Sequence, residues 1–187
     1  MSNEDTISLL SSQLTLTEWA QSQFSSLYEH PGTDANSSPL QTKIQSMFSH
    51  TAQIYMNHTG PMSVEEFTKH LEQTFSTNKV EVEWKECFEI PDDTNHTENS
   101  GAEGKTGIVT GYFIITRTLK FWIRATPAKN YTHVSLSAKI ANVPDASQGS
   151  DESVKTSGGG DTRRIIQLFY TSVSKAAPVH IQGANRT

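Results

Sequence analysis

Apolar residues in the first part of the chain recur at three- and four-residue intervals, which is the spacing of amphipathic α-helices. The first apolar stripe follows Thr15 and Glu18, which have the spacing of a helix-capping box. Ser63 and Glu66 repeat that spacing before the third stripe, and the second follows a proline suited to a first helical turn. The pattern predicts three N-terminal helices, with stripes from Leu16 to Tyr28, from Leu40 to Phe48 and from Val64 to Phe75.

After these stripes, apolar and polar residues alternate, which is the pattern of strands with one buried face. The longest strand cannot stay flat because strand twist accumulates, so we expect the sheet to curve around the helices. Hairpin connections imply an antiparallel order. The prediction is an α+β fold in which the helices pack in the concave face of a strongly curved antiparallel sheet. The predicted strands span Ile54–Tyr55, 80–90, 107–125, 131–143 and 163–173, and the inward face of the last one stays open.

Composition favours one domain that remains in the cytoplasm, with the nucleus as an alternative. The 20 acidic and 15 basic side chains give a formal charge of -5, so the chain as a whole has no positive potential that would attract nucleic acid. No stretch approaches the roughly 20 apolar residues of a membrane span, and the first ten residues lack the pattern of a signal peptide. Cys87 has no second cysteine to pair with. We therefore expect neither nucleic acid nor a membrane as partner.

Polar segments suggest the domain boundaries. We expect a flexible N-terminus at 1–13, a single domain at 14–179 and a C-terminal tail at 180–187. Two polar connections inside the domain, Pro91–Thr106 and Pro144–Thr162, are expected to be mobile. Because they carry few residues able to join a core, we also expect them to be dispensable for folding.

The order of these elements resembles the nuclear transport factor 2-like superfamily, which includes SnoaL-like cyclases and ketosteroid isomerase. The likeness spans roughly residues 14–179, and its most recognisable segment is Met47–Asn57, with the sequence MFSHTAQIYMN. Arg163–Phe169 is similar to the family's final strand. The resemblance implies a cone-shaped barrel with an internal pocket, often dimeric through the outer sheet face. In isomerase-like members a catalytic aspartate follows the short strand; Met56 stands at the matching position here, which argues against an enzyme of that type.

Glu86 is the candidate for chemistry in the interior. The strand alternation points it inward between Trp84 and Phe88, where burial would raise its pKa and suit it to acid–base work. Two structural alternatives stay open: a β-bulge that turns Glu86 to solvent, or an ion pair with Arg117. The seven histidines lack metal-ligand spacing, and we expect neither a metal nor a cofactor.

Three functions remain open at this point. The first is binding of a small apolar ligand in the internal pocket, and the second is a SnoaL-like isomerase, cyclase or dehydratase that uses Glu86. The third is a protein-binding adaptor resembling nuclear transport factor 2, which requires a filled cone and an exposed apolar patch. The expected pocket residues are Trp19, Tyr55, His58, Phe67, Trp84, Glu86, Phe113 and Phe121.

A parity argument predicts the register of the two longest strands. The apolar face is odd-numbered in 107–125 and even-numbered in 131–143, so cross-strand partners must have an odd sum. A four-residue turn at Pro127–Asn130 satisfies this condition. It would pair Trp122 with Ser135 and Arg124 with His133 on the outer face.

That outer face mixes aromatic, basic and small polar residues, which suits a partner surface. We therefore predict a homodimer packed sheet to sheet, with Trp122 and His133 at its centre. The alternative is a solvated sheet face with a single amphipathic tryptophan. The expected dimer face consists of Tyr112, Trp122, Arg124, His133 and Ser135.

Overall fold

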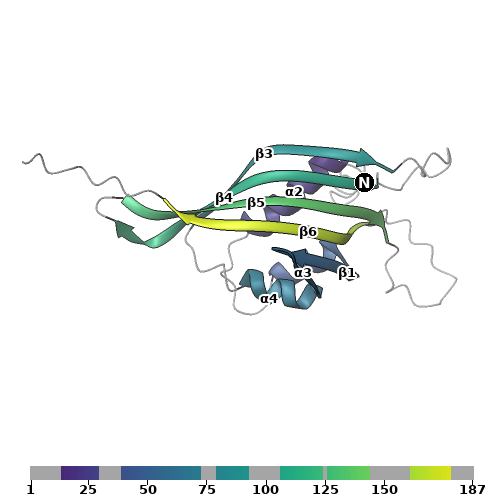
Figure 1. Ribbon diagram of the computed structural model, residues 1–187, viewed down its shortest axis with the longest axis horizontal. Coiled ribbons are helices and arrows are strands. Elements are labelled where there is room, and N and C mark those ends of the chain that lie inside the picture. The colour runs from purple at the N-terminus through teal and green to yellow at the C-terminus, as the bar shows by residue number, and fades with distance from the viewer. Residues whose placement is uncertain are drawn as a thin grey trace, which may run out of the picture.

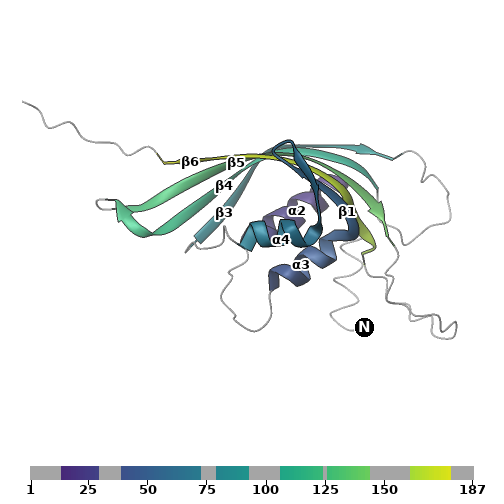
Figure 2. The ribbon, with the colours of Figure 1, turned by 60° about the horizontal axis from the view of Figure 1, so that its bottom comes forward.

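The computed structural model of the chain describes residues 14–29, 39–72, 79–92, 106–123, 126–143 and 161–177. In this part of the chain, a six-stranded sheet arches over three helices (Figures 1 and 2). The helices are α2 (Leu16–Glu29), α3 (Pro39–Met47) and α4 (Val64–Glu72). The strands are β1 (Phe48–Met56), β2 (Thr59–Met62), β3 (Lys79–Pro91), β4 (Gly107–Ile123), β5 (Thr126–Asn142) and β6 (Arg163–Ala176). The predicted flexible segment 1–13 and tail 180–187 lie outside the described residues.

The predicted helix starts are confirmed by their capping contacts. At the start of α2, the Thr15 N–H donates to Glu18 Oε2 at 2.9 Å, and the Glu18 N–H donates to Thr15 Oγ1 at 3.2 Å. Ser63 and Glu66 make the same reciprocal pair before α4, at 2.8 and 3.2 Å. These bonds satisfy backbone N–H groups that the first helical turn leaves without partners.

The sheet order is β2-β1-β6-β5-β4-β3. Strands β3 to β6 form the predicted antiparallel meander, but β1 pairs with β6 in parallel, so the prediction of a wholly antiparallel sheet is wrong at this pairing. A parallel pair needs a long connection, which here includes α4 and four strands, β2 to β5. The sheet also ends at β2 and β3 without joining them, so the predicted cone-shaped barrel is an open, curved sheet.

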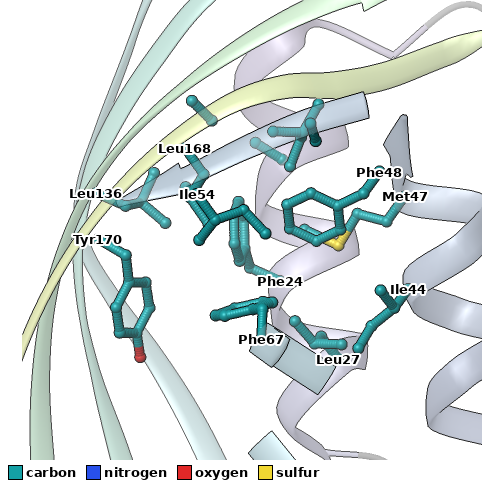
Figure 3. Packing of buried hydrophobic residues seen from close by; sticks show 14 of the residues in the cluster. Phe24, Leu27, Ile44, Met47, Phe48, Ile54, Phe67, Leu136, Leu168 and Tyr170 are labelled. Carbon is teal, nitrogen blue, oxygen red and sulfur yellow. The ribbon is translucent and has the colours of Figure 1, made fainter. Parts of the chain in front are cut away.

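Helix α2 lies in the hollow of the sheet, as predicted, and contacts β3 and β4. Phe24 of α2 packs on Phe113 of β4 with ring centroids 6.2 Å apart, and Trp84 of β3 lies 4.5 Å from Phe113. Helices α3 and α4 pack instead at the β1 side of the sheet, where their apolar residues meet those of β1 and β6 (Figure 3). The prediction that all three helices fill the concave face is thus confirmed only in part.

A buried network holds α2 to the first residues of β6. The side chain of Arg163 is fully buried, and its Nε and Nη2 donate to the two carboxylate oxygens of Asp161, each at 2.9 Å. Trp19 of α2 donates its indole N–H to Asp161 at 2.8 Å, and the Arg163 guanidinium lies 5.4 Å from the Trp19 ring centroid. Because Asp161 makes these contacts, we expect this end of Pro144–Thr162 to contribute to stability. That the two polar connections are dispensable for folding stays a prediction, and residues 93–105 and 144–160 lie outside the described residues.

The register of β4 and β5 follows the predicted parity but not the predicted pairing. Phe113 lies opposite Val134 and Tyr112 opposite Ser135, so the sums are odd, yet the predicted pairs of Ser135 with Trp122 and of His133 with Arg124 are wrong. The strands continue to Ile123 and Thr126, and Trp122 pairs with Pro127. Proline is tolerated there because β6 pairs with β5 only from residue 130 onward, so one side of β5 has no neighbouring strand to receive an N–H.

The register shifts in each of the strand pairings, and two of these shifts are single-residue β-bulges that interrupt the alternation of buried and exposed residues in β3 and β6. The bulge in β3 lies between Trp84 and Glu86, and the one in β6 lies between Ile165 and Gln167. Each bulge adds one residue to its strand and so moves the following side chains to the other face. The bulge in β6 explains why the sequence pattern left the inward face of this strand open.

The network at Arg163 generates a stability prediction. Replacing Asp161 with alanine leaves a buried guanidinium without its carboxylate, so we expect the free energy of unfolding to fall by about 3–5 kcal/mol. Urea denaturation measures the change. The matched control is Glu81→Ala, which removes an exposed pair with Lys79 and should leave the denaturation midpoint unchanged. Equal midpoints for the two variants would contradict a structural role for Asp161.

Candidate functional site on the outer face of the sheet

The residues predicted to line an internal pocket divide into those that pack as core and those that lie elsewhere. Trp19, Phe67 and Phe113 are buried and in contact with other side chains. Trp84 is half-buried, and its indole N–H donates to Ser25 Oγ at 3.0 Å. Phe121 has a side chain outside the described part of the structure. The four described aromatic side chains fill space between α2, α4 and the sheet.

Tyr55 and His58 do not face the interior, so their assignment to the pocket is wrong. Tyr55 stacks on Phe169 on the outer side of the sheet, with ring centroids 4.8 Å apart. His58 is exposed in the turn between β1 and β2, where its φ of 65° and that of Asn57, 48°, make a tight hairpin. Met56, which the resemblance aligns with a catalytic aspartate, is buried and apolar.

Glu86 is exposed, so the prediction that it faces inward is wrong. The bulge after Trp84 reverses the phase of β3 and places Glu86 opposite Tyr112 on the outer face. Cys87 and Glu89 turn inward in its place, and a Glu89 carboxylate oxygen accepts the Thr17 N–H of α2 at 2.8 Å. The Glu89 carboxylate therefore caps the positive, N-terminal end of α2 and has a structural role.

Figure 2 shows the side of the sheet turned away from the helices, here called the convex face. Exposed apolar side chains gather on it. In the register, Ile90 lies opposite Ile108, and a second row crosses the sheet from Phe88 through Thr110 and Ser137 to Phe169 and Tyr55. Phe88 is 61% exposed and Phe169 is 49% exposed. The large hydrophobic residues exposed in the described part of the chain are Phe88, Ile90, Ile108, Phe169 and Val173, and the register places all of them on this face.

The middle of the convex face is built from aromatic and small polar residues. The Tyr112 hydroxyl and His133 Nδ1 are 2.6 Å apart, and the two rings stack at 6.2 Å. Ser135 lies opposite Tyr112, and His133 lies between Ile114 and Val173 on the neighbouring strands. The structure thus brings Tyr112, His133 and Ser135 together on this face, and their role in a dimer stays a prediction. The side chains of Trp122 and Arg124 lie outside the described residues.

The charge of the convex face differs from that of the whole chain. Strands β4, β5 and β6 contain no aspartate or glutamate, although the chain carries a formal charge of -5. Lys129, Lys139 and Lys175 are exposed, and the register places them on the convex face beside Tyr131 and Ile108. The β4–β6 part of this surface is therefore apolar in part, basic and free of carboxylates, whereas β3 brings Glu83 and Glu86 to the same face, opposite Ile114 and Tyr112.

Sequence reasoning missed the apolar part of this surface because it continued the alternation of β3 past residue 85. Phe88 and Ile90 were then placed inside, whereas they lie outside. The sequence did contain a sign of the bulge, because Glu86 is the one charged residue among the apolar even-numbered positions of this strand. A charged residue in such a position indicates either a functional site or a bulge.

In the described residues, no group of three or more His, Cys, Asp or Glu side chains is placed to hold a metal ion. None of the helices described is long and apolar enough to cross a membrane.

No protein-family model and no curated protein sequence matches the chain. Among solved structures, Mtr2 of Candida albicans is similar, with 13% identity and a TM-score of 0.43 over 81% of this chain and 90% of that chain. The complex of C. albicans Mtr2 with the Mex67 M domain is also similar, with 14% identity and a TM-score of 0.42 over 86% and 94%. The element order and sheet topology described above are those of an α+β fold with an open, curved sheet.

The bulge in β3 leads us to predict different effects on stability for substitutions of Glu89 and Glu86. Glu89→Gln weakens the bond that caps α2, so we expect a loss of about 1 kcal/mol in the free energy of unfolding. Glu86→Gln changes an exposed side chain and should leave the urea denaturation midpoint where it is. A larger loss for Glu86→Gln than for Glu89→Gln would contradict the reversed phase.

Cys87 provides a chemical test of the same reversal. Burial, and after it the negative charge of Glu89, raises the pKa of Cys87 to about 11. Since the thiolate is the reacting form, iodoacetamide labelling should accelerate about tenfold per pH unit between about pH 7 and pH 9, with no plateau. In urea the same thiol should level off near its ordinary pKa of about 8.5. A plateau below about pH 9 in the folded protein would show Cys87 to be on the exposed side.

Proposed function

We propose that this protein is a protein-binding module that docks its partner on the convex face of the sheet. The observation that carries the proposal is the placement of Phe88, Ile90, Ile108, Phe169 and Val173 on that single face. Exposed apolar side chains gathered on one surface are a feature of interaction sites, whereas scattered ones are ordinary. The small serines and threonines between them keep the surface even enough for a close contact.

The interior supports this choice over the two small-molecule functions. The described aromatic residues expected to line a pocket are packed against each other or against helices, as a core requires. A hollow of about 240 Å³ exists between α3 and α4, but its lining contains none of those aromatic residues. With Glu86 exposed and Met56 buried, the isomerase hypothesis has lost its general base.

The partner that fits this face presents apolar side chains bordered by carboxylates. Lys139 and Lys175 lie beside the apolar residues, and strands β4 to β6 contain no acid of their own to neutralise them. Opposite charges across an interface speed association and select the partner. In a homodimer in which β4 to β6 of the two copies face each other, the lysines would meet no carboxylate, because the acids of this face lie on β3. A different, acidic protein is therefore the better match, and self-association is the outcome to be separated from it. Mtr2 is bound to the Mex67 M domain in one of the similar structures.

Site-specific photocrosslinking tests the proposal directly. A benzophenone amino acid at Ser137, which lies between Thr110 and Phe169 on the convex face, should give a discrete crosslinked protein in extracts of the cells that make this chain. The control places the same group at Gln45, which is exposed on α3. Light scattering of the purified protein separates the two occupants, because a homodimer has twice the mass of the chain and a binder of other proteins remains monomeric.

The matched variants are Phe169→Asp with Val173→Asp on the convex face, and Gln41→Asp with Gln45→Asp on α3. We expect the first pair to reduce the crosslink at least about tenfold, because apolar contacts at the centre of an interface carry most of its energy. The second pair should leave it unchanged. Equal crosslinking from positions 137 and 45, or a crosslink that survives the Asp pair at 169 and 173, would show that the convex face is not the docking surface.

A further inference from the structure

Two side chains on the convex face make a polar contact beside the apolar residues of the docking surface. The Tyr112 hydroxyl of β4 and His133 Nδ1 of β5 are 2.6 Å apart, and the two rings stack at 6.2 Å with an angle of 15° between them. Both side chains are half-buried. In the register His133 lies between Ile114 of β4 and Val173 of β6, so it borders the exposed apolar residues.

The bond to Tyr112 determines which nitrogen of the neutral His133 ring holds the proton. A neutral imidazole has one N–H donor and one acceptor nitrogen, and the hydrogen bond made by one nitrogen fixes the role of the other. Because an imidazole nitrogen is a stronger base than the oxygen of a phenol, the Tyr112 hydroxyl donates and His133 Nδ1 accepts. The proton of His133 is therefore on Nε2, which becomes a donor.

The Nε2 atom of His133 is open to solvent on the convex face. No described residue forms a hydrogen bond with Nε2, and Nε2 is not among the buried polar atoms that lack a partner. A protein that covers this surface removes the water bonded to Nε2–H. A donor that is buried without an acceptor is unfavourable, so a partner that covers His133 has to bring an acceptor of its own.

The charges around His133 favour a carboxylate as this acceptor. On β6, Lys175 lies on the same face, opposite Tyr131, and strands β4 to β6 contain no acid. The carboxylate in the same row, Glu83 on β3, is two strands or about 10 Å away and is paired with Lys85. The titratable and charged side chains that the register places around His133 on this face are Tyr112, Tyr131, Lys129, Lys175, Glu81, Glu83 and Glu86.

We propose that His133 Nε2–H binds one carboxylate of the partner protein, and that Tyr112 is the positioning residue that holds this N–H in place. The inference rests on the proposed function, since it names a contact through which an acidic partner meets the convex face. A protonated ring suits the contact as well, because it keeps Nε2–H, gains a positive charge and donates Nδ1–H to the Tyr112 oxygen. The partner's carboxylate favours this protonated form, so docking should strengthen as the pH falls.

The first measurement is the tautomer of His133 in the full chain without a partner. Imidazole ¹⁵N signals in NMR spectra distinguish a nitrogen that carries a proton from one that does not, and comparison with His133→Gln assigns the signals. In the neutral ring, at about pH 8.5, we expect the proton on Nε2. Tyr112→Phe should show a mixture of both tautomers. A proton on Nδ1 in the unmodified chain would overturn the proposal.

The second measurement is the crosslink from position 137 with matched substitutions of His133. Glutamine can place its amide N–H close to the position of Nε2–H, whereas asparagine is one carbon shorter. We expect His133→Gln to reduce the crosslink by only about twofold and His133→Asn by at least about tenfold, because the hydrogen bond to a charged group is lost. Tyr112→Phe should reduce it by about threefold, since it leaves the ring without its fixed tautomer.

The pH dependence of the same crosslink identifies the acceptor. Between about pH 8 and about pH 6, the crosslink of the unmodified chain should increase at least about threefold relative to that of His133→Gln, because the amide gains no charge. An uncharged acceptor, such as a backbone carbonyl oxygen, would give the two chains the same pH dependence. That result would refute the carboxylate contact.

The outcomes separate this inference from the proposed function. If His133→Asn crosslinks as the unmodified chain does, while Phe169→Asp with Val173→Asp abolishes the crosslink, the contact with His133 is refuted and the docking surface remains. If position 137 gives no crosslink in the unmodified chain, both proposals fail. Urea denaturation shows whether each variant folds. Should His133→Asn not fold, the tautomer and the pH dependence relative to His133→Gln still decide.

Discussion

The attachment of α2 to the concave side of the sheet is the interaction on which the rest of the structure depends. At one end, Trp19 and Arg163 share the carboxylate of Asp161, which joins the first described helix to the last strand. Along its length, Phe24 packs with Trp84 and Phe113. A curved sheet needs a support of this kind, because an open sheet with a solvated hollow would expose its apolar inner face.

The curvature brings two bulges with it, and these decide which chemistry is available on each face. In β3 the bulge removes Glu86 from the interior and delivers Glu89 to the N-terminus of α2. The same step places Phe88 and Ile90 on the convex face. Residues that an uninterrupted alternation would place inside therefore lie on the outer face, and the candidate site is there rather than in the interior of the fold.

Basic side chains on the two faces of the sheet are neutralised in different ways. Strands β4 to β6 carry basic residues on both sides and no acid. On the convex side, water solvates the lysines, and a partner's carboxylates would meet them there. On the concave side, the fold must supply anions itself, which it does for Arg163 through Asp161 and does not do for Arg117 among the described residues.

The sequence by itself determined the features that depend on neighbours along the chain. The capping boxes at Thr15 and Ser63, the start of α3 at Pro39 and the odd parity of the β4–β5 pairing follow from local hydrogen bonding and from strand alternation. The parallel pairing of β1 with β6, the exposure of Glu86 and the buried Arg117 Nε without a hydrogen-bond partner are evident only in the tertiary structure. Each depends on contacts between residues distant in sequence or on a β-bulge. Neither produces a regular spacing of apolar residues that could be recognised in the sequence.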